Sequence, residues 1–414
     1  MSKLYGCIGE KLKHSFSKEI HNALTDYDYR IIEVERKKLG DFAKAGDFAA
    51  INVTIPYKEM IMPYLFCIDE HANSIGAVNT VVNRDGKLYG YNTDFYGMSM
   101  LLFHAGISVK GKKVVILGTG GTSKTAYAVC HSKEARQIVR VSRTGREDAV
   151  TYEEMYARHT DADIIINTTP VGMFPGIFDK AVDLDKFPAL SGVVDAVYNP
   201  LRTPMILEAK KRGIPAEGGL YMLVAQAVRA SEIFVDTKYD DTECERVYRK
   251  IASEKENIVL IGMPASGKST VARMLASKLG RPVIDTDKLI VEKAGKDIPT
   301  IFSEDGEAAF RELEAEVVCE VAKMTGAIIA TGGGAVLREE NVDALRENGR
   351  LYFIDRPLER LMPTANRPLA STKEDISRRY EERYGIYTKA ADIRVDADCS
   401  PEDVAKKIIE DFTK

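Results

Sequence analysis

Two stretches decide the fold of this chain: KKVVILGTGGTSKTAYAV, from Lys112 to Val129, and ENIVLIGMPASGKSTVARMLASKL, from Glu256 to Leu279. In each, a short apolar run rich in β-branched residues leads into a glycine-rich turn, and a helical pattern follows. This order is typical of the start of a parallel α/β sheet. A glycine-rich turn also lets phosphates approach the backbone N–H groups at a helix N-terminus. We therefore expect two nucleotide-binding domains.

The residues before Lys112 have strand patterns of their own. They contain four runs that we predict to form strands: YGCIG from Tyr5, YRIIEVE from Tyr29, AAINVTI from Ala49 and NTVVNRDGKLYGYNTD from Asn79. The last run includes Asp85-Gly86, a hairpin turn signal. These patterns indicate a further α/β domain at the N-terminus.

We therefore predict an α/β chain with three domains. A substrate-binding and catalytic domain occupies 1–105, and the helices of 220–253 return to it. A Rossmann dinucleotide-binding domain occupies 106–219. A P-loop domain with a parallel sheet occupies 256–414.

One amphipathic helix is expected between the two halves. Cys244, Val247, Tyr248 and Ile251 recur at helical spacing, so this helix should pack on the first half. Only a few residues, around 253–256, then remain as a connector.

Composition excludes several classes of protein. The chain has 414 residues, which suggests two or three domains. Its 58 basic and 62 acidic residues give a net charge of −4, so nothing draws it generally to nucleic acid or an anionic membrane. No apolar run approaches the length that spans a bilayer, and the N-terminus lacks a secretory h-region. The six scattered cysteines indicate reduced thiols, and we expect a cytoplasmic protein whose oligomeric state stays open.

The first glycine-rich turn favours a dinucleotide. GTGGTS, at Gly118 to Ser123, has Ser123 where the usual motif has glycine or alanine, and a plain strand–helix turn is the alternative. The next strand, IVRVSRTGR, lacks the acidic residue that contacts the ribose of NAD. An arginine there can hold a 2′-phosphate, which favours NADP, whereas the alternative is a solvated basic turn. The cofactor-binding candidates are Gly118, Gly120, Gly121, Thr122, Ser142, Arg143, Thr144 and Arg146.

A carbonyl reduction also needs a proton at the forming alkoxide. Lys58 and Asp94 are candidates for this relay, because a carboxylate can hold a lysine that donates to a hydroxyl. By residue type alone, both are more often plain surface residues.

The first part of the chain resembles shikimate dehydrogenase along its whole length. The matching segments are HSFS from His14, NVTIPYK from Asn52, GAVNT from Gly76, NTD from Asn92, GTGGTSKT, NTTPVGM from Asn167, DAVYNPLRTP from Asp195 and GGLYMLVAQA from Gly218. The resemblance implies that Lys58 and Asp94 are the catalytic pair and that Gly219 and Met222 face the nicotinamide. The substrate-binding residues that it implies are Ser15, Ser17, Asn52, Thr54, Asn79, Tyr198 and Gln226.

The second glycine-rich turn is a full P-loop, GMPASGKS at Gly262 to Ser269. Lys268 is expected to reach the β- and γ-phosphates, and Ser269 to ligate Mg²⁺. The nucleotide-binding candidates are Gly262, Ala265, Ser266, Gly267, Lys268, Ser269 and Thr270. The part of the chain that follows the turn is short, which favours a small-molecule kinase.

This second part resembles shikimate kinase. The matching segments are IDTD from Ile284, FSEDGEAAFRELE from Phe302, ATGGGAV from Ala330, NRPLA from Asn366 and ERYGIYTKAAD from Glu382. The resemblance implies Asp285 as support for Mg²⁺, Asp287 as the base and Arg367 as the lid arginine. The acceptor-binding residues that it implies are Arg311, Gly332, Gly333, Gly334 and Arg383. The lid looks short, with Met362-Pro363 where relatives hold adenine.

The resulting hypothesis is a bifunctional enzyme that takes NADP(H), ATP and Mg²⁺. It would reduce 3-dehydroshikimate to shikimate and then phosphorylate shikimate to shikimate 3-phosphate. Two alternatives remain at this point. The dehydrogenase could prefer quinate or NAD, or the chain could be a metabolite-sensing regulator built from the same domains.

Overall fold

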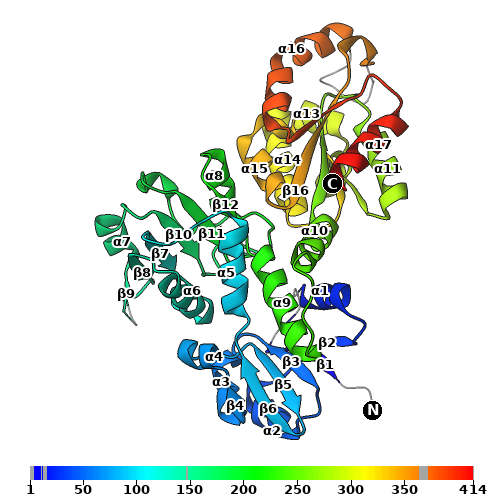
Figure 1. Ribbon diagram of the computed structural model, residues 1–414. Helices are drawn as coiled ribbons and strands as arrows, with labels where there is room; N and C mark the ends of the chain where they lie inside the picture. The colour runs from blue at the N-terminus through cyan, green and yellow to red at the C-terminus, as the bar shows by residue number, and fades with distance from the viewer. Residues whose placement is uncertain (1–3, 11, 13–15, 146–147, 363–371, 414) are drawn as a thin grey trace. The chain divides into compact units, whose positions relative to one another are not determined.

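The computed structural model describes residues 4–10, 12, 16–145, 148–362 and 372–413. The chain divides into two compact units (Figure 1). The first comprises Met1–Met173, Asp179–Tyr198 and Glu208–Ile251. The second comprises Phe174–Phe178, Asn199–Leu207 and Ala252–Lys414, so it includes two segments from the earlier part of the sequence.

The first unit contains a mixed sheet near the N-terminus. Its strands are β1 (Tyr5–Gly9), β2 (Tyr29–Glu33), β3 (Ala50–Val53), β4 (Cys67–Ile68), β5 (Thr80–Arg84) and β6 (Lys87–Tyr91). Their order is β2-β1-β3-β5-β6-β4, with β5 antiparallel to both of its neighbours. The four predicted strand runs are confirmed, and Asp85-Gly86 forms the turn between β5 and β6.

Short helices surround this sheet, and a long helix returns to it. They are α1 (Ser17–Leu24), η1 (Arg36–Lys38), α2 (Leu39–Ala45), α3 (Tyr57–Met60), η2 (Met62–Tyr64), α4 (Glu70–Ile75), α5 (Asp94–His104) and α9 (Leu220–Val235). Helices α5 and α9 lie side by side, cyan and green in Figure 1. A Cβ on Gly97 would lie 2.7 Å from the Met222 carbonyl oxygen, so this close approach requires glycine.

The predicted amphipathic helix is confirmed as α10 (Glu243–Lys255). Cys244, Val247 and Ile251 are buried, and the Tyr248 ring packs 5.0 Å from the ring of Tyr221 in the same unit. The expected connector at 253–256 is wrong, because the helical hydrogen bonding continues. The Glu256 amide still donates to Ala252, and the next strand begins one residue later.

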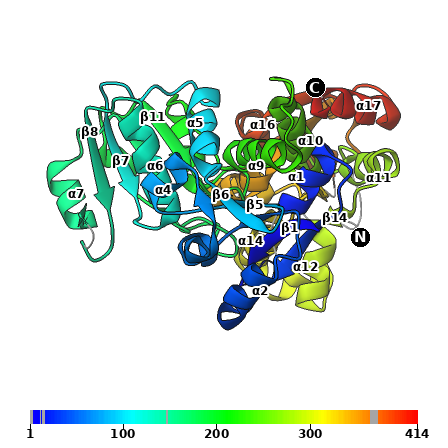
Figure 2. The same ribbon diagram turned by 60° about the horizontal axis from the view of Figure 1, so that its bottom comes forward.

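The second sheet of the first unit is entirely parallel (Figure 2). Its strands are β7 (Lys113–Leu117), β8 (Gln137–Val141), β9 (Ala149–Val150), β10 (Ile164–Asn167), β11 (Gly192–Asp195) and β12 (Ala216–Glu217). Along the sheet the order is β9-β8-β7-β10-β11-β12, the doubly wound order of dinucleotide-binding domains. Its helices are α6 (Gly121–Ser132), α7 (Tyr152–Arg158) and η3 (Leu184–Lys186). Helix α8 (Pro204–Lys211) begins in the segment Asn199–Leu207 of the second unit and ends in the first.

The second unit is built on a five-stranded parallel sheet. Its strands are β13 (Asn257–Ile261), β14 (Val283–Asp285), β15 (Ile328–Ala330), β16 (Gly349–Asp355) and β17 (Ile393–Asp396), in the order β14-β15-β13-β16-β17. Alternate residues of β13 enter two cores, with Val259 and Ile261 on one face and Ile258 and Leu260 on the other. Such double burial explains the continuous apolar run NIVLI.

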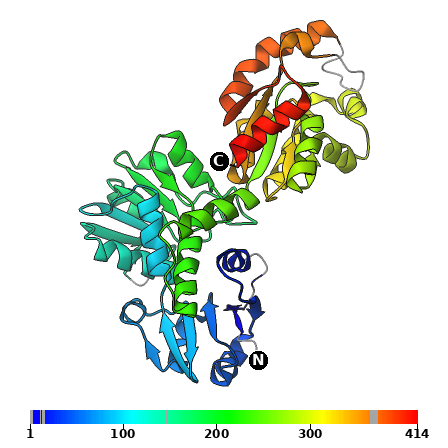
Figure 3. The same ribbon diagram turned by 45° about the vertical axis from the view of Figure 1, so that its right-hand side comes forward.

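Helices cover both faces of this sheet. They are α11 (Lys268–Leu279), α12 (Thr286–Ala294), α13 (Ile298–Glu304), α14 (Gly306–Ala322), η4 (Ala335–Leu337), α15 (Glu339–Asn348), η5 (Leu358–Arg360), α16 (Lys373–Ala390) and α17 (Pro401–Phe412). Helices α11 and α17 share one core, on the face that Figure 3 brings forward with α17 in red. Helices α14, α15 and α16 contribute to the other core.

The predicted α/β class is confirmed, and each sheet falls within one of the three predicted ranges. Within the described ranges, no helix combines the length and the apolar character needed to cross a bilayer.

Candidate active sites

The two residues of the predicted proton relay form an ion pair in the first unit. Lys58 lies on α3, and Asp94 is the first residue of α5. Lys58 Nζ lies 2.5 Å from Asp94 Oδ2, and both side chains are largely buried. Because the carboxylate fixes the direction of the ammonium group, the pair can present a proton to a bound oxygen.

Thr93 links two of the predicted substrate-binding residues, Asn79 and Gln226, by hydrogen bonds. Its amide donates to Asn79 Oδ1 at 2.7 Å, and its hydroxyl accepts from Asn79 Nδ2 at 3.0 Å. The same hydroxyl lies 3.4 Å from Gln226 Oε1, and Asn52 donates to the Asn79 carbonyl at 3.4 Å. Sequence reasoning missed Thr93, although it stands directly before Asp94 in the NTD segment.

Of the remaining substrate candidates, Ser17 and Tyr198 lie at the start of α1, and Thr54 contacts β1. Ser17 is the buried first residue of that helix, and the Thr54 amide donates to the carbonyl of Ile8. The Tyr198 ring packs on Phe16 with 5.2 Å between centroids. Burial raises the pKa of Tyr198 to about 12, so its hydroxyl stays neutral at pH 7. Ser15 lies outside the described residues.

The first glycine-rich turn stands beside the proton relay. Gly118 has a φ of +107°, and a Cβ there would lie 2.8 Å from Thr168 Oγ1. Ser123 donates to the Gly118 carbonyl at 2.7 Å, which explains a serine at the sixth position. Helix α6 begins at Gly121, after Gly120, and a Cβ on Gly121 would lie 4.0 Å from Lys58 Cδ. The helix N-terminus and Lys58 are therefore neighbours.

The basic turn predicted to hold a 2′-phosphate follows β8. Ser142 Oγ accepts from the Gly145 amide at 2.9 Å, which closes the turn. Arg143 and Thr144 are exposed on it. Arg146 lies outside the described residues. Thr122 follows Gly121 in the first turn of α6, which begins at the glycine-rich turn.

The residues predicted to face the nicotinamide lie at the start of α9. A Cβ on Gly219 would lie 2.2 Å from the Ala196 carbonyl oxygen, so only glycine fits there. Met222, one turn later, is buried. This close contact between Gly219 and Ala196 places the start of α9 against the segment that follows β11.

One cavity of about 590 Å³ in the second unit brings together most of the predicted kinase residues. Its lining includes Ala265, Ser266, Gly267, Lys268, Ser269, Thr270, Asp285, Asp287, Arg311, Gly332, Gly333, Gly334 and Arg383. Gly262 lies outside this lining, at the end of β13, with a φ of +147°. Arg367 lies outside the described residues.

The lysine of the P-loop forms hydrogen bonds with the first residues of the same loop. Lys268 Nζ donates to the carbonyls of Gly262 and Met263 at 2.7 and 2.9 Å. Gly267, with a φ of +97°, precedes α11, so the loop leads directly into a helix N-terminus. This is the arrangement that receives phosphates on backbone N–H groups.

Oxygen ligands suited to Mg²⁺ lie next to the P-loop. Ser269 Oγ donates to Asp285 Oδ2 at 3.1 Å. Asp285 Oδ1 accepts from the amides of Asp287 and Lys288, which fixes the carboxylate at the start of α12. A hydroxyl and a held carboxylate fit the hard-oxygen preference of this ion.

The acceptor side of the cavity is built around Arg311. Its guanidinium donates to Glu314 at 2.6 Å and to Glu307 at 3.0 Å. A Cβ on Gly334 would lie 1.9 Å from Arg311 Nη1, and a Cβ on Gly332 would lie 2.5 Å from Asp287 Oδ1. The glycine run therefore lets the backbone approach both side chains.

Sequence reasoning missed two charged residues of this cavity, Glu314 and Arg379. Burial raises the pKa of Glu314, an effect that Arg311 opposes and Asp287 reinforces. Burial and the nearby Arg383 lower the pKa of Arg379, whose Nε is buried without a hydrogen-bond partner. Arg379 lies one helical turn before Arg383, a spacing that could have indicated it.

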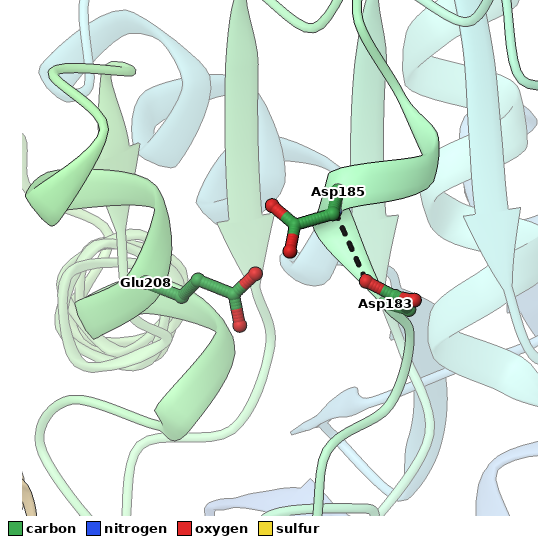
Figure 4. Close-up of side chains that lie close together, drawn as sticks. All are labelled: Asp183, Asp185 and Glu208. Carbon is green, nitrogen blue, oxygen red and sulfur yellow. Dashed lines mark hydrogen bonds between the residues drawn. The ribbon is translucent and has the colours of Figure 1, made fainter.

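Three carboxylates lie close together in the first unit: those of Asp183, Asp185 and Glu208 (Figure 4). Each has a hydrogen bond or an ion pair with a protein group. Asp183 accepts from the Asp185 amide at 3.1 Å and so caps η3. Glu208 pairs with Lys180 at 3.1 Å, and Asp185 with Arg212 at 3.7 Å. We assign this group no ligand.

Comparisons with known proteins identify the families that the two parts of the chain resemble. The family model described as shikimate dehydrogenase substrate binding domain matches residues 7–81, and the one described as shikimate kinase matches residues 264–413. Shikimate dehydrogenase (NADP(+)) of Clostridium perfringens is 38% identical over 268 residues, covering 60% of this chain and 98% of the relative.

Solved structures resemble the same part of the chain. A chorismate mutase/shikimate 5-dehydrogenase fusion protein from Clostridium acetobutylicum is 34% identical, with a TM-score of 0.57 over 61% of this chain and 97% of that one. Shikimate 5-dehydrogenase of Thermus thermophilus, in complex with NADP(H) and shikimate, is 26% identical, with a TM-score of 0.54 over 60% and 99%. The chain belongs to the shikimate dehydrogenase family through its N-terminal part and carries a shikimate kinase domain after it.

Proposed function

We propose that the chain is a bifunctional enzyme acting on successive compounds. The first unit reduces 3-dehydroshikimate to shikimate with NADPH, and the second phosphorylates shikimate to shikimate 3-phosphate with ATP and Mg²⁺. The main support is that one cavity is lined by the P-loop together with Asp287, Arg311 and Arg383. The same chain also holds the Lys58–Asp94 ion pair. The product of the first site is thus the substrate of the second.

For the reduction, bound NADPH supplies a hydride to the carbonyl carbon. Lys58 delivers the proton that the forming alkoxide needs, and Asp94 holds the lysine in place. Asn52, Asn79 and Gln226 offer amide groups to the substrate's carboxylate and hydroxyls; Asn52 donates to Asn79, and Thr93 links Asn79 to Gln226. A site built from such fixed polar groups rejects analogues that lack a hydroxyl.

We assign the preference for NADP over NAD to the turn after β8. Arg143 is exposed where the 2′-phosphate of NADP would lie, and no acidic side chain stands at Ser142–Thr144 to repel it. Gly118, Gly120 and Gly121 leave room for the pyrophosphate at the start of α6.

For the phosphorylation, bound ATP with Mg²⁺ supplies the phosphoryl group. Asp287 accepts the proton of the attacking hydroxyl, and Arg311 with Arg383 holds the acceptor carboxylate. Ser269 and Asp285 are assigned to the metal. Lys268 and Arg367 are assigned to the charge on the transferring group.

A coupled assay tests the whole proposal. With 3-dehydroshikimate, NADPH, ATP and Mg²⁺, the chain should form shikimate 3-phosphate, measured by mass spectrometry. Omitting ATP should stop the sequence at shikimate. Turnover of quinate in place of shikimate would favour the quinate alternative, and no turnover of any substrate would favour a sensory protein.

Lys58→Ala should lower kcat of the dehydrogenase by about 10²- to 10⁴-fold, because it removes the proton donor. NADPH oxidation at 340 nm measures the loss. Lys112→Ala removes a partly buried ion pair with Asp163 in the same unit and serves as the control. Equal activity of the two variants would contradict the assignment of Lys58.

Gly334→Ala should abolish acceptor binding by the kinase, because the new methyl group would displace the Arg311 guanidinium. Titration calorimetry should show ATP affinity within about threefold of the parent, as the P-loop is untouched. Gly385→Ala is the matched control, since a Cβ there meets nothing within 4 Å. Joint loss of both ligands would reject the carboxylate clamp, and Arg311→Ala provides a second variant.

Arg143→Ala should raise the KM for NADPH by about 10- to 100-fold, as expected for loss of hydrogen bonds to a charged group. The KM for NADH should change little, because NADH has no 2′-phosphate. Arg136→Ala, on an exposed arginine of the same sheet, is the control. Equal effects on NADPH and NADH would contradict the assignment.

A further inference from the structure

Helix α16 contributes two arginines to the kinase cavity. Arg379 and Arg383 both line it, and they are four residues apart on this helix. Side chains at this spacing lie on the same face of a helix. Within the part of the chain that the structure describes, Arg379 forms no hydrogen bond or ion pair, and its Nε is buried. Its guanidinium is therefore available to a bound anion.

The other cations that line the cavity already have protein acceptors. Lys268 donates to two carbonyls of the P-loop. Arg311 donates to the carboxylate of Glu314 at 2.6 Å. Arg383 donates to a backbone carbonyl of the glycine run at 3.2 Å. Among the described residues, the guanidinium of Arg379 has no such acceptor.

The charged neighbours of Arg379 place it at the acceptor end of the cavity. Arg383 and Glu307 are the charged groups that affect its pKa most, Arg383 by lowering it and Glu307 by raising it. Glu307 also accepts a hydrogen bond from Arg311 at 3.0 Å. Arg379 therefore lies beside the two arginines that the proposed function gives to the acceptor carboxylate.

The empty cavity is an unfavourable place for this positive charge. Burial and the like charge of Arg383 lower the pKa of Arg379. A buried polar group without a partner also costs stability. An arginine nevertheless keeps its charge in a protein. A bound carboxylate would supply the missing hydrogen-bond acceptor and balance the repulsion between the two guanidinium groups.

We propose that Arg379 is a further binding residue for the acceptor carboxylate, beside Arg311 and Arg383. The charge of Arg311 is already balanced in part by Glu307 and Glu314. Arg379 therefore supplies the positive charge that makes the site prefer an acid to a neutral analogue of the same shape. The inference rests on the proposed kinase function and assigns its specificity for the acid.

Full-length Arg379→Ala should raise the kinase KM for shikimate by about 10- to 100-fold, as expected for loss of a hydrogen bond between charged groups. The kcat should stay within about threefold, because the carboxylate contact is the same in the ground state and the transition state. The KM for ATP should stay within about twofold, since the P-loop is untouched. ADP release with ATP and Mg²⁺ measures all three and reports only the kinase site.

Arg378→Ala is the matched control. It removes the same charge from the adjacent position of α16, where the side chain is 62% exposed and pairs with Asp375 at 3.0 Å. Arg378 does not line the cavity. Its KM for shikimate should therefore remain that of the parent. Equal increases in the two variants would show a general effect of charge on α16 and would overturn the proposal.

Shikimate methyl ester separates a contact with the carboxylate from a structural effect, because the ester has no negative charge. It is measured as an alternative substrate and as a competitive inhibitor of the kinase. Arg379→Ala should weaken binding of the acid but leave that of the ester within about twofold, so the preference for the acid falls about tenfold or more. Equal losses for acid and ester would reject the contact.

Two further variants keep the test decisive. Arg379→Lys should give an intermediate KM for shikimate, since a lysine keeps the charge but loses the planar fork. Arg379→Leu keeps the apolar volume and replaces the alanine variant if that chain does not fold. A KM for ATP that rises as much as the KM for shikimate would place the arginine on the nucleotide and overturn the proposal.

Arg383→Ala distinguishes failure of this inference from failure of the proposed function. If the parent phosphorylates shikimate and Arg383→Ala loses affinity for it while Arg379→Ala does not, only the role of Arg379 is rejected. If the parent transfers no phosphoryl group from ATP to shikimate, the proposed kinase function itself is rejected.

Discussion

Both halves depend on one constraint, which is that a buried parallel strand must run straight into a glycine-rich helix N-terminus. The five residues of β7 and the five of β13 are all buried, so each strand holds the following turn rigidly. Each turn requires glycine for a different contact. Gly118 avoids Thr168, and Gly262 avoids the carbonyl of Ile354. Backbone N–H groups can then face phosphates at the carboxyl edge of each sheet.

The chemistry of each proposed site comes from the side chains that lie beside the carboxyl edge of its sheet. In the first unit, α6 begins next to Lys58, so the ion pair with Asp94 lies at the nucleotide end. In the second unit, the run Gly332–Gly334 brings backbone against Asp287 and Arg311. In the proposed function a few fixed charges capture the anionic ligands, which is compatible with a net charge of only −4.

The second unit also includes two segments from the earlier part of the sequence. In one of them, Arg202 donates to the carbonyls of Arg346 in α15 and Gly349 in β16 and pairs with the buried Glu256. The joint between the halves is short as well, because α10 runs to Lys255 and β13 begins at Asn257.

The sequence alone determined the α/β class, the strand runs that start at Tyr5, Tyr29, Ala49 and Asn79, the helix at Cys244 and the two glycine-rich turns. These features follow from local periodicity and turn chemistry, which the chain carries in adjacent residues. Thr93, Glu314, Arg379 and the Arg202 contacts needed the tertiary structure. Each acquires its role from partners distant in sequence, such as Gln226 for Thr93 and Glu256 for Arg202. The continuation of α10 through the expected connector also escaped prediction, because Ser253–Glu256 carries no residue that stops a helix.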